Sequence, residues 1–185
     1  RIMGNVKMKS TIFNQHQVNH ALKNEEGMFR VVIKLSSEGY FLDRIGEMAY
    51  KPEKLQGWPI DHLAPYQVGE TIFVKEAFNI FCGQVAYKTT ITGNERYFWL
   101  PANRMKQEHS RLTLRIKSVK VERLQDISEK DAFRSGYFTI PNREAGESYV
   151  SKFREFWNST HKKPEEKWEA SPWVFAYSYE VIKNN

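Results

Sequence analysis

Cysteine is nearly absent from this 185-residue chain, and long apolar runs are absent altogether. The single cysteine, Cys82, excludes an internal disulfide and fits a reducing compartment, so we expect a cytoplasmic protein. No stretch approaches the ~20 apolar residues of a membrane span, and the first residues lack the apolar core of a signal peptide. The sequence therefore predicts no membrane association, and it contains no internal repeat or low-complexity tract.

The short motifs of common catalytic and cofactor chemistry are also missing. There is no P-loop, no dinucleotide-binding glycine pattern and no G-x-S-x-G nucleophile turn. His16 and His20 have the i, i+4 spacing of zinc ligands, but no glutamate of an H-E-x-x-H motif stands between them, and the other three histidines are scattered. We therefore expect neither a metal site nor a cofactor.

Positive charge is what the chain has in excess. The net charge is +6 and the isoelectric point is about 9.3, which favours an anionic partner such as RNA. Between Asn103 and Arg123, seven basic residues stand against only two acidic ones. This basic stretch is either a surface that follows a phosphate backbone or the charged outer side of an edge strand, which prevents aggregation. Its basic residues are Arg104, Lys106, Arg111, Arg115, Lys117, Lys120 and Arg123.

The order of apolar residues predicts several strands and three short helices. Asn14 and Gln17 form a capping box at the start of the first helix, and Ser128 caps a second helix that Gly136 ends. In the basic stretch the apolar phase shifts by one residue, which predicts a β-bulge near residues 117–118. The other predicted elements are strands at 10–13, 29–35, 70–78 and 172–182, a hairpin of 84–90 with 95–100 that turns at Gly93-Asn94, and a helix over 146–159.

These elements predict an α+β fold, a small and mostly antiparallel β-barrel with about three helices at its side. Residues 9–183 are expected to form one domain, and residues 1–8 a disordered tail or an expression remnant. Residues 36–69 have no sustained periodicity. They are expected to form an irregular insertion, which either lies over the domain or acts as a flexible flap.

Glu76 is the first candidate for a functional site. It follows Ile72 and Val74 in the apolar phase of its predicted strand, so its carboxylate is expected to face the interior. There it either accepts hydrogen bonds from a nucleotide base or acts as a general base, which makes it the best catalytic candidate. The competing interpretation is a structural ion pair with Arg30 or Arg111, because an unpaired buried charge is costly.

Other residue types are candidates for nucleic-acid binding. Arg115 and Lys117 are expected to reach phosphates from the basic stretch. Trp58, in the loop "GWPIDH", is the best candidate for stacking on a base, whereas the aromatic residues of the hairpin are more typical of a core. Lys75 lies on the strand face opposite Glu76, where a solvated lysine is the simpler interpretation.

Several stretches, taken in order, resemble the ASCH domain, a family of PUA-like β-barrels. The resemblance is greatest to its subgroup in bacteriophages and prophages. The stretches are "VGETIFVKEAF", a tryptophan-containing hairpin, "SRLTLRIKSVKVERLQDISEKDAFRSGY" and "WEASPWVFAYSYEV". The subgroup pattern V-E-R-L-Q-D-I-S-E-[ED]-D-A is the most specific part, and Glu122–Ser128, Asp131 and Ala132 match it. The resemblance covers about residues 9–182.

The resemblance implies a cleft between the first helix and the mouth of a barrel, with Arg111 at its rim, that binds a nucleotide, a nucleoside or RNA. Some ASCH proteins are amidohydrolases that deacetylate N4-acetylcytidine with a lysine, a threonine and a glutamate. These positions fall on Glu26, Phe29 and Ser135. A carboxylate cannot replace the amine and phenylalanine has no hydroxyl, so the substitutions count against this activity.

The sequence thus predicts a protein that binds RNA, a nucleotide or a modified nucleoside at the mouth of a barrel, with catalysis unproven. Two alternatives stay open. One is an enzyme, either a hydrolase of a modified nucleoside or a ribonuclease that uses Glu76. The other is a phage protein-interaction module directed at a host protein. The predicted binding residues are Arg30, Trp58, Lys75, Glu76, Arg111, Arg115 and Lys117.

Overall fold

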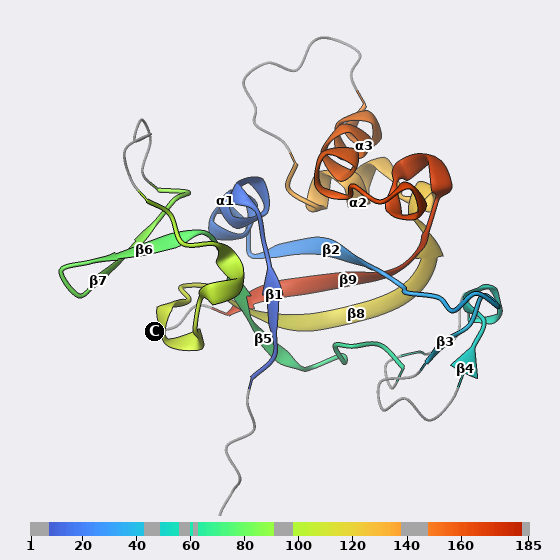
Figure 1. Cartoon of the computed structure of the whole chain (residues 1–185), viewed down its shortest axis with the longest axis horizontal. Helices are drawn as coiled ribbons and strands as arrows, with labels where there is room; N and C mark the ends of the chain where they lie inside the picture. Colours follow the sequence, from blue (N-terminus) through green and yellow to red (C-terminus); the bar gives the residue numbers. More distant parts are fainter. Residues whose placement is uncertain are drawn as a thin grey trace, which may run out of the picture.

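A mixed five-stranded β-sheet is the centre of the fold (Figure 1). The computed structural model describes residues 8–42, 49–55, 60, 63–90, 98–137 and 148–182. The sheet order is β1-β5-β8-β9-β2, in which only β1 and β5 pair in parallel. The strands are β1 (Ser10–Ile12), β5 (Thr71–Lys75), β8 (Thr113–Arg123), β9 (Trp173–Ile182) and β2 (Glu26–Val32).

Three α-helices and two small hairpins complete the described part of the chain. They are α1 (Gln15–Lys23), α2 (Glu129–Arg134) and α3 (Tyr149–Thr160), with β3 (Phe41–Leu42) paired to β4 (Ala49–Tyr50) and β6 (Phe78–Phe81) to β7 (Gln84–Tyr87). Short 3-10 turns are η1 (Pro52–Lys54), η2 (Ala102–Arg104), η3 (Gln107–His109), η4 (Leu124–Asp126), η5 (Pro164–Glu166) and η6 (Trp168–Ala170). Among these residues, no helix is long and apolar enough to cross a membrane.

The predicted closure of the sheet into a barrel is not found within the described residues. There, β1 and β2 are the outer strands of the sheet and do not pair with each other. In Figure 1, β1 runs across the direction of the long strands β2, β9 and β8. The α+β class is therefore confirmed, and the closed PUA-like barrel stays a prediction.

The predicted β-bulge is confirmed, because the register of β8 against β9 shifts between Ile116 and Ser118. Before the shift Leu114 and Ile116 pack into the main hydrophobic cluster, and after it Val121 does. One extra residue thus keeps the apolar side chains of a long, bending strand on the same face of the sheet.

The predicted helix starts are confirmed as well. The Asn14 side chain accepts hydrogen bonds from the amides of His16 and Gln17, and the Gln17 side chain accepts one from the amide of Asn14, so the capping box is complete. Ser128 accepts from the amide of Asp131 at the start of α2. These bonds satisfy amide groups that the first turn of a helix leaves without a partner.

The two faces of the sheet pack against different cores. Phe175, Tyr177 and Tyr179 of β9 point into the main cluster, which also receives side chains of α1. Val174 points to the other face, where it packs with residues of α2 and α3 such as Phe153. The second core therefore fixes α2 and α3 on the sheet, close to β2 (Figure 1).

The insertion predicted over residues 36–69 contributes to the main core where the structure describes it. Phe41, Ile60, Leu63 and Ala64 are all buried in that cluster. Their burial favours an insertion that lies over the domain. Strand β2, predicted over residues 29–35, begins and ends three residues earlier than expected.

The predicted strand over residues 70–78 is divided at Glu76, which corrects the sequence interpretation. β5 ends at Lys75 and β6 begins at Phe78. Between them the chain turns toward β7, where the amide of Lys88 donates to the carbonyl of Ala77 at 3.0 Å. The strand therefore ends before Glu76, although the alternation of apolar residues continues to Phe78.

The predicted hairpin is also corrected. β7 pairs with β6, and the turn between them is Cys82-Gly83, whose φ angles of 48° and 79° are those of a two-residue hairpin turn. The turn predicted at Gly93-Asn94 lies outside the described residues. Leu100 forms an isolated antiparallel bridge to Phe78 of β6.

Candidate functional site

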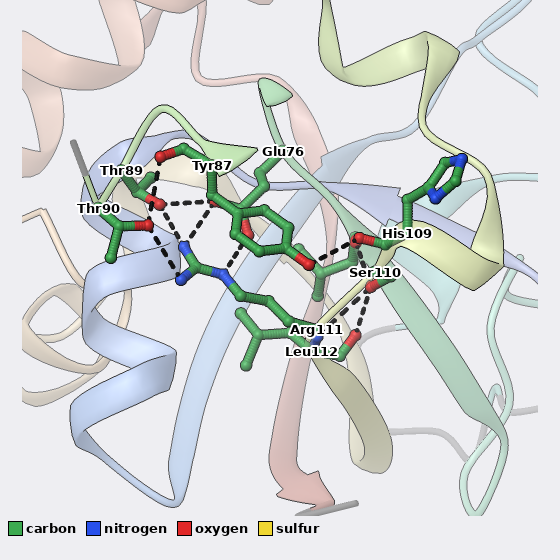
Figure 2. A network of polar contacts seen from close by, with 9 residues as sticks. Glu76, Tyr87, Thr89, Thr90, His109, Ser110, Arg111 and Leu112 are labelled. Atoms are coloured by element: carbon green, nitrogen blue, oxygen red, sulfur yellow. Dashed lines mark hydrogen bonds and ion pairs between the residues drawn. The ribbon is translucent and has the colours of Figure 1, made fainter. Parts of the chain in front are cut away.

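The carboxylate of Glu76 lies in a dense polar network at the base of the β6–β7 hairpin (Figure 2). The residue is only 2% exposed. Arg111 donates to both of its oxygens, from Nε at 2.8 Å and from Nη2 at 2.9 Å, and the hydroxyl of Thr89 donates to Oε2 at 2.6 Å. Arg111 also donates to the hydroxyls of Thr89 and, at 3.3 Å, Thr90.

Tyr87 and Ser110 hold Arg111 in place. The guanidinium lies over the ring of Tyr87, with its carbon 4.1 Å from the ring centroid. Burial raises the pKa of Tyr87, and its hydroxyl donates to the carbonyl of His109 at 3.1 Å. Ser110 donates to the carbonyl of Val74 at 2.7 Å. Since Glu76 and Val74 belong to the sheet side and Tyr87 to the hairpin, this network fastens the hairpin to the sheet.

This geometry favours the structural interpretation of Glu76. Its partner is Arg111, one of the two arginines considered, and both carboxylate oxygens are occupied by groups of the protein itself. A cavity lined by described residues lies beside the start of β9, away from Glu76. A ligand at Glu76 would therefore have to displace an ion pair and a hydroxyl.

Arg30 belongs to a second buried network and is not brought to Glu76. Its guanidinium lies 2.8 Å from Glu122, and its Nη1 donates to the hydroxyl of Ser135 at 3.2 Å. Ser135 in turn donates to the carbonyl of Asp131 at 2.8 Å. This network connects β2, β8 and α2.

The three positions that the ASCH resemblance links to amide hydrolysis do not form a polar pocket together. Phe29 is buried and stacks on Tyr177 with ring centroids 4.9 Å apart. Glu26 is exposed and lies 3.3 Å from Arg134. Ser135 is held by Arg30. Each side chain thus has a packing or pairing role.

The basic stretch is largely neutralised in the folded protein. Arg115 and Lys117 lie 3.0 Å and 3.2 Å from Glu180, and Lys120 lies 2.7 Å from Glu122. The hydrogen bond from Lys117 lowers the pKa of Glu180, as does the one from Arg115. Because Glu180 comes from β9, far away in the sequence, the apparent concentration of charge between residues 103 and 123 overstates the positive field over β8.

Uncompensated positive charge gathers instead beside the hairpin. Within the part of the chain that is described, no carboxylate forms an ion pair with Lys75, Lys88 or Arg104. Lys75 donates to the carbonyl of Asn103 at 3.4 Å, which places it next to Arg104. Lys88 is held near β5 by its bond to Ala77. We use the name hairpin face for the residues Lys75, Ile80, Lys88, Phe98 and Arg104, which lie on or beside the β6–β7 hairpin in the chain.

Two apolar side chains of this group are exposed as well. Phe98 is 77% exposed and Ile80 is 44% exposed. Phe98 precedes Leu100 by two residues, and Ile80 follows Phe78 by two. Both residues are therefore two positions along the chain from the Phe78–Leu100 bridge. Sequence analysis missed Lys88 and Phe98. The usable signal was the absence of acidic residues from the stretch between Ala77 and Asn94.

Trp58, the predicted stacking residue, lies outside the described residues. Within the described ranges, no three histidine, cysteine, aspartate or glutamate side chains gather as a metal site requires. Cys82 is exposed at the hairpin turn. Comparisons with models of known families, with curated proteins and with solved structures found no match, so the resemblance to the ASCH domain rests on sequence motifs alone.

Proposed function

We propose that this protein is a PUA-like, ASCH-related domain that binds single-stranded RNA, and that the hairpin face is its contact surface. The observation that carries the proposal is Phe98, which is 77% exposed two residues before the bridge from Leu100 to Phe78 of the hairpin. Lys75, Lys88 and Arg104 lie on or beside the same hairpin, and no described carboxylate pairs with them. A basic surface with exposed aromatic rings is the usual platform for single strands. The sequence motifs and the α+β class support the family, and the net charge of +6 supports an anionic partner.

The cations supply an attraction that depends on salt. Lys75, Lys88 and Arg104 each release counterions when they contact a phosphate, which for single strands lowers the slope of log K against log salt by about 0.7 per contact. By contrast, Arg115 and Lys117 share Glu180, so their binding to phosphate competes with an existing ion pair. The hairpin face is therefore the stronger phosphate site.

The aromatic residue supplies an attraction that does not depend on salt. Stacking of a base on an aromatic ring contributes about 1–3 kcal/mol and tolerates any base. An exposed phenylalanine costs solubility in a free protein, and contact with a base would remove that cost. The two kinds of contact can thus be separated by measurement.

The test uses fluorescence anisotropy of a fluorescein-labelled 12-nucleotide polyuridine RNA between 50 and 300 mM KCl. We expect Lys88→Gln/Arg104→Gln to weaken binding and to reduce the salt slope by about 1.4, since two phosphate contacts are lost. We expect Phe98→Ser to weaken binding about tenfold with an unchanged slope.

The matched control is Lys117→Gln/Lys120→Gln, which removes the same charge from β8. In this variant Glu180 keeps Arg115 and Glu122 keeps Arg30. An equal loss in the control would show that total charge matters and not the hairpin face. Binding of uridine monophosphate as tightly as the 12-mer would also overturn the proposal, because a surface of spaced contacts needs a strand.

A further inference from the structure

A groove at the opposite end of β8 has no role in the proposed RNA contact. It encloses about 550 Å³ between the segment that leaves β2 and the coil that leads into β9. Its lining includes Val32, Lys34, Leu35, Arg123, Lys163 and Trp173. β8 spans eleven residues between Thr113 and Arg123, so roughly 30 Å separate this groove from Arg111. In Figure 1 the chain leaves β2 beneath the coil that precedes β9.

The backbone of β2 offers a free edge to this groove. β2 is the last strand of the sheet, and it pairs only with β9 in the described residues. The amide of Ile33 donates to the carbonyl of Trp173 at 2.9 Å, so the odd-numbered residues face β9. In an antiparallel pair the alternate residues face outward. Val32 and Lys34 therefore present their amides and carbonyls to the groove.

The middle of the same edge is covered, because Arg30 is buried against Ser135. Glu26, at the start of β2, is exposed and lies 3.3 Å from Arg134 of α2. After the end of the strand Lys34 and Leu35 are exposed, with Leu35 at 41%. This end of the edge coincides with the groove.

The groove has charges of both signs around an apolar floor. Arg123 lies over the ring of Trp173 at 4.3 Å and donates to the carbonyl of Ser171 at 3.0 Å. Lys34 has no carboxylate partner among the described residues, and Lys163 lies 3.4 Å from Glu166, which also lines the groove. Glu165 is the other carboxylate of the lining, so Lys34 and Arg123 leave the groove one positive charge in excess.

We propose that this groove binds an acidic peptide in an extended conformation, which adds to the free edge of β2 as a sixth strand of the sheet. Backbone hydrogen bonds to Val32 and Lys34 supply the pairing, and alternate apolar side chains enter between Leu35 and Trp173. Acidic residues of the peptide reach Lys34 and Arg123. The volume lies within the 300–1,000 Å³ typical of ligand sites, which suits a few residues of strand.

The same observations disfavour two other occupants. A nucleotide base would need a free aromatic face, but Trp173 is only 7% exposed and Arg123 covers it. A second copy of this chain that pairs through β2 would bring its own Lys34 close to the first, which is repulsive. Neither objection applies to an acidic peptide.

The test uses the fluorescein-labelled peptide EVDVEV in an anisotropy titration of the whole protein. We expect saturable binding, at least tenfold weaker binding of KVKVKV, and at least fivefold weaker binding to Lys34→Gln. The matched control Lys117→Gln, which loses the same charge from β8, should bind EVDVEV as the unchanged protein does. Lys34→Pro removes one outward amide and should weaken binding at least tenfold.

N-methylated peptides decide whether the backbone pairs. Methylation of residues 1, 3 and 5, or of residues 2, 4 and 6, removes the amides on one side of the strand. We expect one methylation pattern to abolish binding and the other to be tolerated. This test uses the unchanged protein, so it does not depend on whether Lys34→Pro folds. Equal effects of both patterns, no saturable binding, displacement of the peptide by uridine monophosphate, or a dimer in solution that excludes the peptide would each overturn the proposal.

Discussion

Replacement of Arg111 by alanine should destabilise the protein more than replacement of any exposed basic residue of β8. Arg111→Ala leaves the carboxylate of Glu76, 2% exposed, with the Thr89 hydroxyl as its one remaining partner from the network. Removal of one member of a buried ion pair costs about 3–5 kcal/mol. The side chain of Arg111 is 20% exposed, so water can partly solvate the carboxylate, and we expect about 3 kcal/mol.

Two further variants separate charge from packing. In Glu76→Leu/Arg111→Leu both charges are absent, and such replacements of an ion pair by apolar side chains are often neutral. Thr89 loses its partners, which costs about 1 kcal/mol, whereas the exposed Thr90 still donates to the carbonyl of Tyr87. We therefore expect the double variant to be more stable than Arg111→Ala. The control Arg115→Ala removes a half-exposed arginine whose partner Glu180 keeps Lys117, so it should cost less than about 1 kcal/mol.

Urea unfolding followed by tryptophan fluorescence measures these differences. With a slope of about 2 kcal/mol per molar urea, Arg111→Ala should lower the midpoint by about 1.5 M and Arg115→Ala by less than 0.5 M. Equal midpoints for Arg111→Ala and Arg115→Ala would refute the reasoning, because the carboxylate would then not depend on its arginine. A double variant as unstable as Arg111→Ala would show that packing on Tyr87 and not the buried charge is responsible.

Three other changes test local features of the fold. Burial, with the nearby charge of Arg134, lowers the pKa of His20. The contribution of the neutral imidazole to stability is therefore complete above pH 6.5 and is lost as the pH falls below it. The difference between the urea midpoints at pH 7.5 and at pH 5.5 should be smaller in His20→Asn than in the unchanged protein. Gly136→Ala should cost at least about 2 kcal/mol, because its φ is 79° and its new Cβ would stand 2.6 Å from the Cβ of His20; thermal unfolding measures this. Asn14→Ala should cost about 0.5–2 kcal/mol in urea unfolding, since it removes the cap of α1, whereas Asn14→Asp should cost less.

Local chemistry is what the sequence predicted well. The capping box needs only Asn14 and Gln17 three residues apart, and the bulge needs only the shift of apolar phase after Ile116. The capping box depends only on neighbours within one element. The bulge is a register shift against β9, but the apolar phase along β8 alone was enough to indicate its place.

Long-range pairing is what the sequence left open. The strand predicted through Glu76 ends at Lys75, because Ala77 bonds to Lys88 eleven residues later. The two arginines offered to Glu76 were equivalent in sequence, and only the fold brings Arg111 to it and Arg30 to Glu122. The choice depends on which face of which strand each side chain occupies.

The ion pairs of the basic residues could not be predicted from the sequence either. Counted along the chain, residues 103–123 contain most of the excess positive charge. In the sheet, Arg115 stands opposite Glu180 of β9, and Lys120 lies beside Glu122 of its own strand and Asp131 of α2. A count along the sequence locates the basic residues, but it does not show which of them form ion pairs with acidic residues elsewhere in the fold.

The buried ion pair and the hairpin face are physically connected. Arg111 joins Glu76 on the sheet side to Tyr87, Thr89 and Thr90 at the end of β7, and Lys88 lies within that same run. A hairpin released from the sheet would keep its cations but lose their fixed spacing from Lys75, and a phosphate backbone requires that spacing. Under the proposed function, the Glu76–Arg111 pair therefore supports RNA binding through the position of the hairpin, and Glu76 is buried because of its structural contacts.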